Sequence, residues 1–295
     1  MLLVGIAVSA FVLLVFCACA GVVFLTQVVS WYEYANANPE LVARRFASGR
    51  LWAVSKVALL ETLALFHLVF LWPFGLFHQG FPRRLQPDDT PVILVHGLFQ
   101  NRTCWWWLAR ALRRRGNKVL RYSISPWHNI EAVTEILDQH IDRLRHRYGI
   151  RQVVLVGHSM GGIIARNYVQ LRGGAPKVAA IIQLATPNQG SKLAPFAISP
   201  LGVLLVPDSP FLQRLNAAPL PDCCPVTTIF SRRDNMVLPY SGCHLPGARN
   251  IELDGLGHTS LLFSPRVLNL VHQLLSHAGD VRCTASTLSP ADAAN

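Results

Sequence analysis

Residues 153–166, VVLVGHSMGGIIAR, place a serine between glycines directly after a run of branched apolar residues. Residues 157–161 match the pattern Gly-x-Ser-x-Gly, in which a strand ends in a sharp turn and a helix begins. Glycines are needed there because the turn brings neighbouring backbone too close for larger side chains. The motif predicts that the Ser159 hydroxyl lies at a helix N-terminus, where the helix dipole favours developing negative charge. Ser159 is therefore a candidate nucleophile, and the alternative is a plain glycine-rich turn.

Beyond residue 83, short apolar runs alternate with amphipathic segments, which is typical of an α/β fold with a mainly parallel sheet. Strands are expected at residues 91–97, 118–125, 152–157, 178–186, 226–231 and near 250–253. Helices are expected at residues 103–116, at 129–149, after Ser159 and at 265–277. The sequence thus predicts one α/β domain over residues 83–278, followed by a disordered tail over 279–295.

A serine hydroxyl needs a base, and the base needs an acid that orients it. With this turn motif, the acid and then the histidine follow the serine along the chain. The histidines after Ser159 are His244, His258, His272 and His277. His258, in the glycine-flanked loop DGLGHTSLL after the last expected strand, is the predicted base. Asp234, in IFSRRDNMVLP at the end of the preceding strand, is the predicted acid. Alternatively these are a surface-loop histidine and a turn aspartate. Asp254 lies too near His258 in sequence to reach its far ring nitrogen.

An oxyanion formed at such a serine needs two backbone donors. Met160, the residue after the candidate nucleophile, is expected to supply one N–H. Leu98, in HGLFQN after the first strand of the domain, is expected to supply the other, with Phe99 as the one-residue alternative. His96 in the same motif is expected to brace the loop rather than to carry a proton.

Five blocks in order carry a family resemblance: VILVHGLFQN, GHSMGG, ATPNQGSKLA, FSRRDNMVLP and GLGHTSLL. Together, over roughly residues 90–278, they resemble the bacterial lipase and esterase branch of the α/β-hydrolase superfamily. The resemblance implies the α/β-hydrolase fold and hydrolysis of a carboxylic ester. In that reaction Ser159 attacks the acyl carbonyl, His258 transfers the proton, Asp234 orients His258, and water releases the acyl-enzyme. Alternatives are an acyltransferase or thioesterase with the same three residues, or a non-catalytic membrane scaffold with this fold.

An apolar insertion over residues 187–224 includes ISPLGVLLVPDSPFLQRLN. The resemblance implies that such a region caps an acyl pocket, and the alternative is a pair of helices packed on the domain. Together with the three tryptophans at 105–107, it favours a lipid or another acyl ester as substrate over a polar compound. Those tryptophans are alternatively core residues or a docking surface for the N-terminal helices.

Residues 1–82 are predicted to anchor the protein in a membrane. Residues 2–30 contain no charged residue, and this uncharged stretch is longer than the roughly 20 residues of a membrane-spanning helix. A cleaved signal peptide is the alternative, because residues 18–20 (Ala-Cys-Ala) have the form of a cleavage site. A second apolar stretch, residues 62–82, either spans the membrane, lies in its interface or packs as a buried helix. We expect one or two membrane helices, dispensable for cleavage of a short soluble ester.

The charges around these stretches predict an orientation. Arg44, Arg45, Arg50 and Lys56 lie between the two apolar stretches, which by the positive-inside rule keeps that loop cytoplasmic. If both stretches span, the α/β domain lies outside the cytoplasm, as expected for a bacterial inner-membrane protein facing outward. Arg83 and Arg84 favour the opposite side.

The net charge of +11 is spread through the domain, with its densest cluster in RALRRRG at residues 110–116. This cluster either contacts anionic lipid head groups or is the solvated end of a helix. No nucleic-acid pattern of interleaved aromatic and basic residues is present, and the sequence indicates no obligate protein partner.

The chain contains no C-x-x-C spacing, and HTSLLFSPRVLNL after His258 holds no carboxylate for a hard cation. We therefore predict neither a metal nor a cofactor. One disulfide among Cys223, Cys224 and Cys243, or free buried thiols at these positions, are equally compatible with the sequence.

Overall fold

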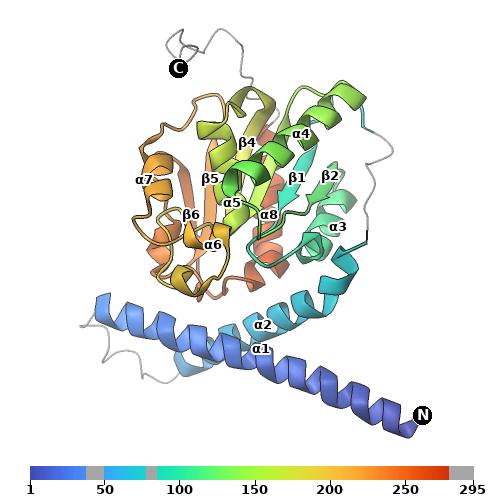
Figure 1. The fold of residues 1–295 in the computed structure, drawn as a ribbon, viewed down its shortest axis with the longest axis vertical. Helices are drawn as coiled ribbons and strands as arrows, with labels where there is room; N and C mark the ends of the chain where they lie inside the picture. Colours follow the sequence, from blue (N-terminus) through green and yellow to red (C-terminus); the bar gives the residue numbers. More distant parts are fainter. Residues whose placement is uncertain (38–49, 78–84, 279–295) are drawn as a thin grey trace.

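The computed structural model describes residues 1–37, 50–77 and 85–278. At its centre is a six-stranded parallel sheet in the order β2-β1-β3-β4-β5-β6 (Figure 1). The strands are β1 (Val92–Val95), β2 (Val119–Tyr122), β3 (Val153–His158), β4 (Val178–Leu184), β5 (Val226–Ser231) and β6 (Arg249–Leu253). All six expected strands are present, so the predicted α/β fold with a parallel sheet is confirmed.

The helices of the α/β domain are α3 (Trp106–Arg114), α4 (Ile130–Tyr148), α5 (Met160–Arg166), α6 (Pro200–Val203), α7 (Pro210–Ala217) and α8 (Pro265–Ala278). Local sequence sets their ends, as α4 shows. The Asn129 side chain accepts the Ala132 N–H at 2.8 Å, and Gly149 ends the helix in the left-handed conformation with φ 69°.

The sheet separates two apolar cores because neighbouring strand residues point to opposite faces. Ile93 and Val95 of β1 pack with α4, α5 and α7 on one face. Val92 and Leu94 pack with α3 and α8 on the other face. Both faces are therefore covered, which explains why the strands read as continuous apolar runs.

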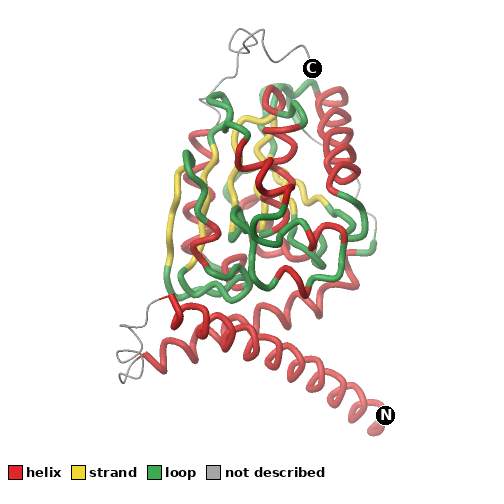
Figure 2. Tube along the Cα trace, turned by 60° about the vertical axis from the view of Figure 1, so that its left-hand side comes forward, coloured by secondary structure: helices red, strands yellow, loops and turns green. Residues whose placement is uncertain are grey.

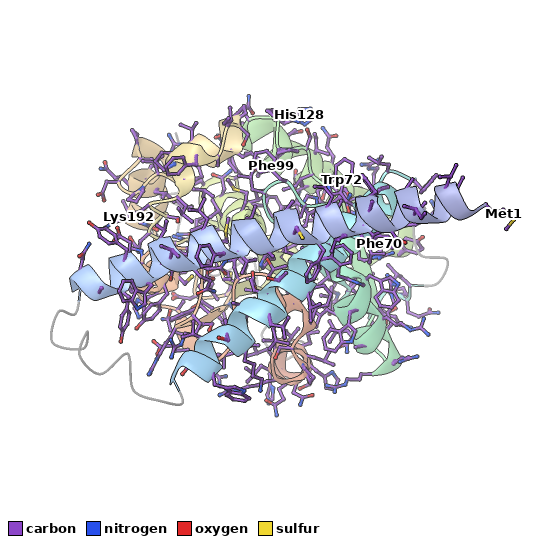
Figure 3. The ribbon with its side chains drawn as sticks, turned by 90° about the horizontal axis from the view of Figure 1, so that it is seen from below. Met1, Phe70, Trp72, Phe99, His128 and Lys192 are labelled. Carbon is purple, nitrogen blue, oxygen red and sulfur yellow. The ribbon has the colours of Figure 1, made fainter. Side chains whose placement is uncertain are left out.

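The N-terminal segment forms two helices, α1 (Leu2–Ala37) and α2 (Arg50–Leu71), which lie across one end of the sheet (Figures 1 and 2). Both are long and apolar enough to cross a membrane. In α1, residues 3–14 are exposed, whereas Cys19, Val23 and Thr26 are buried against the rest of the protein. The N-terminal end of α1 extends past the domain (Figure 3).

Helix α2 packs one side against the α/β domain, so the interpretation of the second apolar stretch as a packed helix matches this structure. Val57, Ala64 and Leu68 are buried. The helix begins earlier than the predicted stretch and ends at Leu71, because Pro73 follows and the chain turns into the 3-10 helix η2 (Trp72–Gly75). The predictions for Arg44, Arg45, Arg83, Arg84 and the tail 279–295 fall outside the described residues.

The insertion at 187–224 divides into a packed and an exposed part. Its buried apolar side chains join the core on the α4–α5 face of the sheet: Leu201, Leu205, Phe211, Leu212 and Leu215. Phe196, Ile198 and Val203 are exposed. The insertion thus largely matches the alternative of helices packed on the domain, and its exposed apolar part leaves the acyl cap as a prediction.

The three tryptophans at 105–107 also differ in burial, since Trp105 is fully buried whereas Trp106 is 48% exposed. Trp106 and Trp107 face α2, which makes them a docking surface for this helix. Cys224 and Cys243 are buried free thiols, so neither forms a disulfide with Cys223.

Candidate active site

Ser159 lies in the turn between β3 and α5, with φ 52° and ψ −121°. Residues with side chains rarely adopt positive φ, and such strain is typical of functional turns. The adjacent glycines are required by contact: a Cβ atom at Gly157 would collide with the backbone of Gly162, and one at Gly161 with the Val95 carbonyl. The sharp strand-to-helix turn expected from the motif is therefore present, with Ser159 at its apex.

His258 and Asp234 form a buried pair. The His258 Nδ1 atom lies 2.9 Å from Asp234 Oδ2 and 3.1 Å from Oδ1. Oδ1 also accepts the Met236 and Val237 N–H groups, each at 2.8 Å, which fixes the carboxylate. Because the carboxylate only accepts, Nδ1 carries the proton, and Nε2 is left with a lone pair.

The histidine before Ser159 connects the serine turn to the His258 loop. The His158 Nε2 atom lies 3.1 Å from the His258 carbonyl oxygen, and the two ring centroids are 4.7 Å apart. The loop after β1 also reaches the turn, because a Cβ atom at Gly97 would lie 3.1 Å from Ser159 Cβ. Loops after β1, β3, β5 and β6 thus meet at the carboxyl edge of the sheet.

The expected oxyanion donors lie in two of these loops. Met160 is the first residue of α5, where a backbone N–H has no acceptor within the helix. Leu98 lies in the turn after β1, and the neighbouring Phe99 has φ 57° and an exposed side chain. His96 Nδ1 donates to the Gly97 carbonyl at 2.8 Å, and its Nε2 accepts the Ile124 N–H at 2.9 Å. These bonds match a bracing role for His96.

Burial and charge set the protonation of the histidines. Burial lowers the pKa of His258, but the charge and hydrogen bond of Asp234 and the charge of Glu61 together raise it above its ordinary value. Burial, with a smaller contribution from the His258 charge, lowers the pKa of His158 well below its ordinary value. His158 is therefore neutral, and its Nε2–H donates to the His258 carbonyl.

The other acidic and histidine candidates lie elsewhere. Asp254 pairs with Arg233 at 3.2 Å on the surface. On α8, His272 contacts Asn117, which follows α3, and His277 contacts the Gln273 carbonyl. Of these acids and histidines, the structure therefore places Asp234 next to His258, whereas Asp254, His272 and His277 have other partners.

Several residues that support the site were not identified from the sequence. The Gln100 Oε1 atom accepts the Gly97 N–H at 3.1 Å and so braces the loop beside Ser159. The Asn235 Oδ1 atom accepts the His258 N–H at 3.2 Å, and its Nδ2 donates to Thr26 Oγ1 of α1 at 2.8 Å. The Ser30 hydroxyl donates to the Asp234 carbonyl at 3.2 Å. Thr26 and Ser30 could have been suspected only as polar residues in a long apolar helix.

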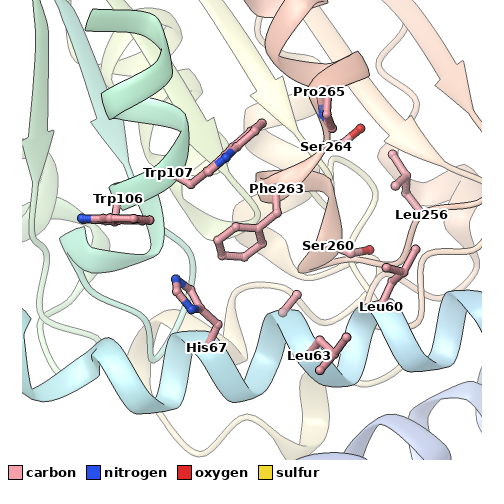
Figure 4. A pocket seen from close by; sticks show the side chains of 11 residues that line it. Leu60, Leu63, His67, Trp106, Trp107, Leu256, Ser260, Phe263, Ser264 and Pro265 are labelled. Carbon is pink, nitrogen blue, oxygen red and sulfur yellow. The ribbon is translucent and has the colours of Figure 1, made fainter. Parts of the chain in front are cut away.

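A cavity of about 430 Å³ lies between α2, α3 and the 3-10 helix η8 (Ser260–Phe263) (Figure 4). Its walls are mainly apolar, with Trp106, Trp107 and Phe263 facing Leu63 of α2. None of the three candidate catalytic residues, Ser159, Asp234 and His258, lines this cavity. Next to it, sharing Trp106, is a hollow lined by the side chains of Arg110, Arg113, Arg114 and Arg121.

Comparison with known proteins agrees with this geometry. Residues 90–209 match the family model of the alpha/beta hydrolase fold. The chain is 34% identical over 110 residues to a triacylglycerol lipase of Pseudomonas fragi, covering 35% of this chain and 36% of that protein. It is 31% identical over 143 residues to an sn-1-specific diacylglycerol lipase of Mus musculus, covering 45% and 41%. The matches thus span about two fifths or less of these curated relatives.

Solved structures show the same fold. A Bacillus licheniformis lipase in its mature form superposes with a TM-score of 0.59 at 19% identity, covering 68% of this chain and 98% of that one. Aspergillus fumigatus lipase B superposes with a TM-score of 0.58 at 19% identity, covering 71% and 58%. With its strand order, serine turn, histidine–aspartate pair and sequence relatives, this chain has the α/β-hydrolase fold and is similar to the lipases and esterases of that superfamily.

Proposed function

We propose that this protein is a membrane-anchored serine hydrolase that cleaves carboxylic esters of lipids or related acyl compounds. The observation that carries the proposal is the buried Asp234–His258 pair, with Nδ1 and Oδ2 at 2.9 Å, beside a serine held at positive φ. A serine, a base and an acid with these roles form a nucleophilic unit that recurs on several folds.

In this reaction Ser159 Oγ attacks the acyl carbonyl while His258 Nε2 takes its proton. Asp234 stabilises the imidazolium through the Nδ1–H bond. The Leu98 and Met160 N–H groups stabilise the oxyanion of the tetrahedral intermediate. His258 then protonates the leaving alcohol, and a water molecule activated by the same base releases the acyl group from Ser159.

A lipid-like acyl group is supported by the relatives and by the surface of the insertion. The relatives named above are a triacylglycerol lipase and a diacylglycerol lipase. Phe196, Ile198 and Val203 are 80%, 84% and 62% exposed, which is a large apolar area for the solvent-facing side of a domain. Such patches are typical of sites that meet lipids or proteins. We infer that this part of the insertion contacts the acyl chain or the bilayer.

Membrane anchoring is supported by α1. Its 36 residues measure about 54 Å at 1.5 Å per residue, well beyond the roughly 30 Å of a hydrocarbon core. Residues 3–14 are exposed and apolar, which suits the bilayer, although they measure only about 18 Å by themselves, whereas Cys19, Val23 and Thr26 in the second half are buried against the rest of the protein. Trp72, Phe74 and Phe77 after α2 are 43%, 57% and 69% exposed, and aromatic rings favour the membrane interface.

The side of the membrane is proposed from the sequence alone. If both apolar stretches span the membrane, the basic residues between them keep the loop in the cytoplasm, and the domain lies outside a bacterial inner membrane. Protease accessibility in spheroplasts would test this placement: digestion of the domain from outside supports it, and protection contradicts it.

The function is tested by labelling full-length protein in detergent with a fluorophosphonate probe, with Ser159→Ala as the control. We expect labelling of the wild type alone. Activity is then measured on aryl esters of increasing chain length, on a matched thioester, and with added alcohol acceptors. Faster thioester cleavage or acyl transfer to the alcohol would favour the enzyme alternatives. A folded wild-type protein without labelling would favour the scaffold.

A further inference from the structure

Glu61 is a charged residue in the apolar helix α2, and its side chain is almost completely buried, with 1% of the residue exposed. Its Oε1 accepts the Thr259 N–H at 2.6 Å, and its Oε2 accepts the Ser260 N–H at 2.8 Å. In the described part of the chain no Lys or Arg forms an ion pair with it. A buried carboxylate is costly unless it is hydrogen-bonded, so these two bonds account for its place in the helix.

These bonds join α2 to the two residues that follow His258. The loop approaches so closely that a Cβ atom at Gly257 would collide with the Glu61 carboxylate. On its other side, the His258 N–H is held by Asn235, which is itself bonded to Thr26 of α1. The backbone of the candidate base is therefore fixed from both N-terminal helices.

Glu61 also adds charge near the base. Three titratable groups face the His258 ring or its backbone: Asp234 from the loop after β5, Glu61 from α2 and neutral His158 from β3. Burial lowers the pKa of His258, and the negative charges of Asp234 and Glu61 raise it. A substitution that removes the Glu61 charge thus has an electrostatic signature, apart from any loss of packing.

We propose that Glu61 is a positioning residue for His258, so that the N-terminal helices complete the active site as well as anchoring it. The proposal rests on the proposed function in one respect, the assignment of His258 as base. It is at odds with the expectation that the first 80 residues are dispensable for a short soluble ester, which remains to be tested. That expectation treated the helices as separable, whereas Glu61, Thr26 and Ser30 bond to the catalytic loops.

The test uses full-length protein with Glu61→Gln, which keeps the side-chain size but removes the charge and places an amide NH₂ against one backbone N–H. Glu61→Ala removes both acceptors. Glu33→Gln is the matched control, because Glu33 is a carboxylate of α1 that pairs with Lys192 and has no bond to the His258 loop. Folding of each variant is checked by circular dichroism and thermal midpoint.

We expect Glu61→Gln to lower kcat on a short aryl ester by about 10-fold or more, approaching the roughly 100-fold of a misplaced catalytic group. KM should change little, because Glu61 contacts no substrate. The acidic limb of the kcat/KM profile should move to lower pH, because loss of the negative charge lowers the pKa of His258. Glu33→Gln should behave as the wild type.

The His258 ring is also titrated by NMR in the wild type and in Glu61→Gln, with the signal assigned from His258→Gln. This measurement needs no turnover, so it tests the Glu61 contact even if ester hydrolysis itself is absent. A lower His258 pKa in Glu61→Gln supports the proposal. A folded Glu61→Gln protein with unchanged kcat, unchanged acidic limb and unchanged His258 titration would overturn it. If Glu61→Ala does not fold, Glu61→Gln decides.

Discussion

His158 donates its Nε2–H to the carbonyl oxygen of His258 at 3.1 Å, and the two rings lie 4.7 Å apart. This contact joins the residue before the candidate nucleophile to the candidate base, although 100 residues separate them along the chain. Together with the Asp234 bond to Nδ1, it fixes His258 from its backbone and from its ring. The His258 Nε2 atom is the nitrogen left to act on Ser159.

The first prediction concerns the three candidate catalytic residues. Ser159→Ala should abolish ester turnover without loss of folding, because the serine side chain makes no packing contribution that alanine lacks. Asp234→Asn should lower kcat by about 10⁴-fold, because an amide stabilises the wrong tautomer of the histidine. Steady-state kinetics on a short aryl ester measures both.

Asp254→Asn is the control for the acid, since Asp254 pairs with Arg233 at the surface and does not contact His258. It should retain a near-normal kcat. Loss of activity in Asp254→Asn together with a nearly active Asp234→Asn would contradict the assignment of the acid.

Sequence reasoning selected the candidate catalytic residues because their signals are local. A nucleophile turn needs glycines at fixed spacing around Ser159, and each of its partners follows an apolar strand that can be read from the pattern. The parallel sheet then brings the strand ends together, so the order along the chain was enough to select Asp234 and His258. The lengths of the strands were less accurate: β1 and β2 are shorter than expected, because their pairing ends at Val95 and Tyr122.

The second prediction concerns the glycines of the turn. Gly161→Ala should destabilise the protein by about 2 kcal/mol or more, because the added methyl group collides with the Val95 carbonyl and overpacking in a rigid site is costly. Chemical denaturation followed by tryptophan fluorescence measures the free energy of unfolding. Gly21→Ala is the control, since outside its own helix no atom of the described residues lies within 4 Å of the added methyl group, and it should be neutral or, by helix propensity, slightly stabilising. Equal stability of the two variants would show that the turn relaxes.

The third prediction is that stability falls as pH falls from about 6.5. Burial lowers the pKa of His96 to about 4, so the folded state keeps it neutral while the unfolded chain takes up a proton below about 6.5. The folded state therefore loses about 1.4 kcal/mol per pH unit from this group between those two values. His258 acts with the opposite sign, because its raised pKa stabilises the folded state below 6.5, and that contribution is lost only as pH rises.

Thermal midpoints at a series of pH values measure this effect in the wild type and in His96→Gln. The glutamine can accept the Ile124 N–H without titrating. We expect a shallower fall in midpoint for His96→Gln between pH 6.5 and 5, even if its stability at pH 7 is lower. Parallel curves for the two proteins would assign the acid sensitivity to other groups.

The contacts of the N-terminal helices with the His258 loop could not be predicted from the sequence, for a physical reason. Glu61 lies 198 residues from Thr259, and no local pattern predicts a contact across that distance. In the sequence, Glu61 marked the edge of an apolar stretch. A carboxylate beside a long apolar stretch must find donors if it is buried, and that requirement is the one signal in the sequence that could have indicated a partner.

The last prediction concerns a chain that starts at Pro82 and so lacks α1 and α2. Without Glu61, the Thr259 and Ser260 N–H groups lose their acceptors. Without Thr26, the Asn235 side-chain amide loses the hydroxyl that accepts its N–H. In addition, the faces of the 3-10 helices η3 (Arg102–Trp105) and η8 that pack on α2 become exposed. We therefore expect the truncated chain to be unstable or, where it folds in detergent, to cleave a short aryl ester at least about 100-fold more slowly than the full-length protein. Circular dichroism separates these two outcomes.

A second truncation, after Gly21, tests the N-terminal half of α1 alone. That shorter deletion keeps Thr26, Ser30 and Glu33, so it should retain activity on the short ester and lose activity mainly on vesicle lipid, where the anchor raises the local substrate concentration. Normal activity of the chain from Pro82 on the short ester would restore the division into a dispensable anchor and an independent enzyme.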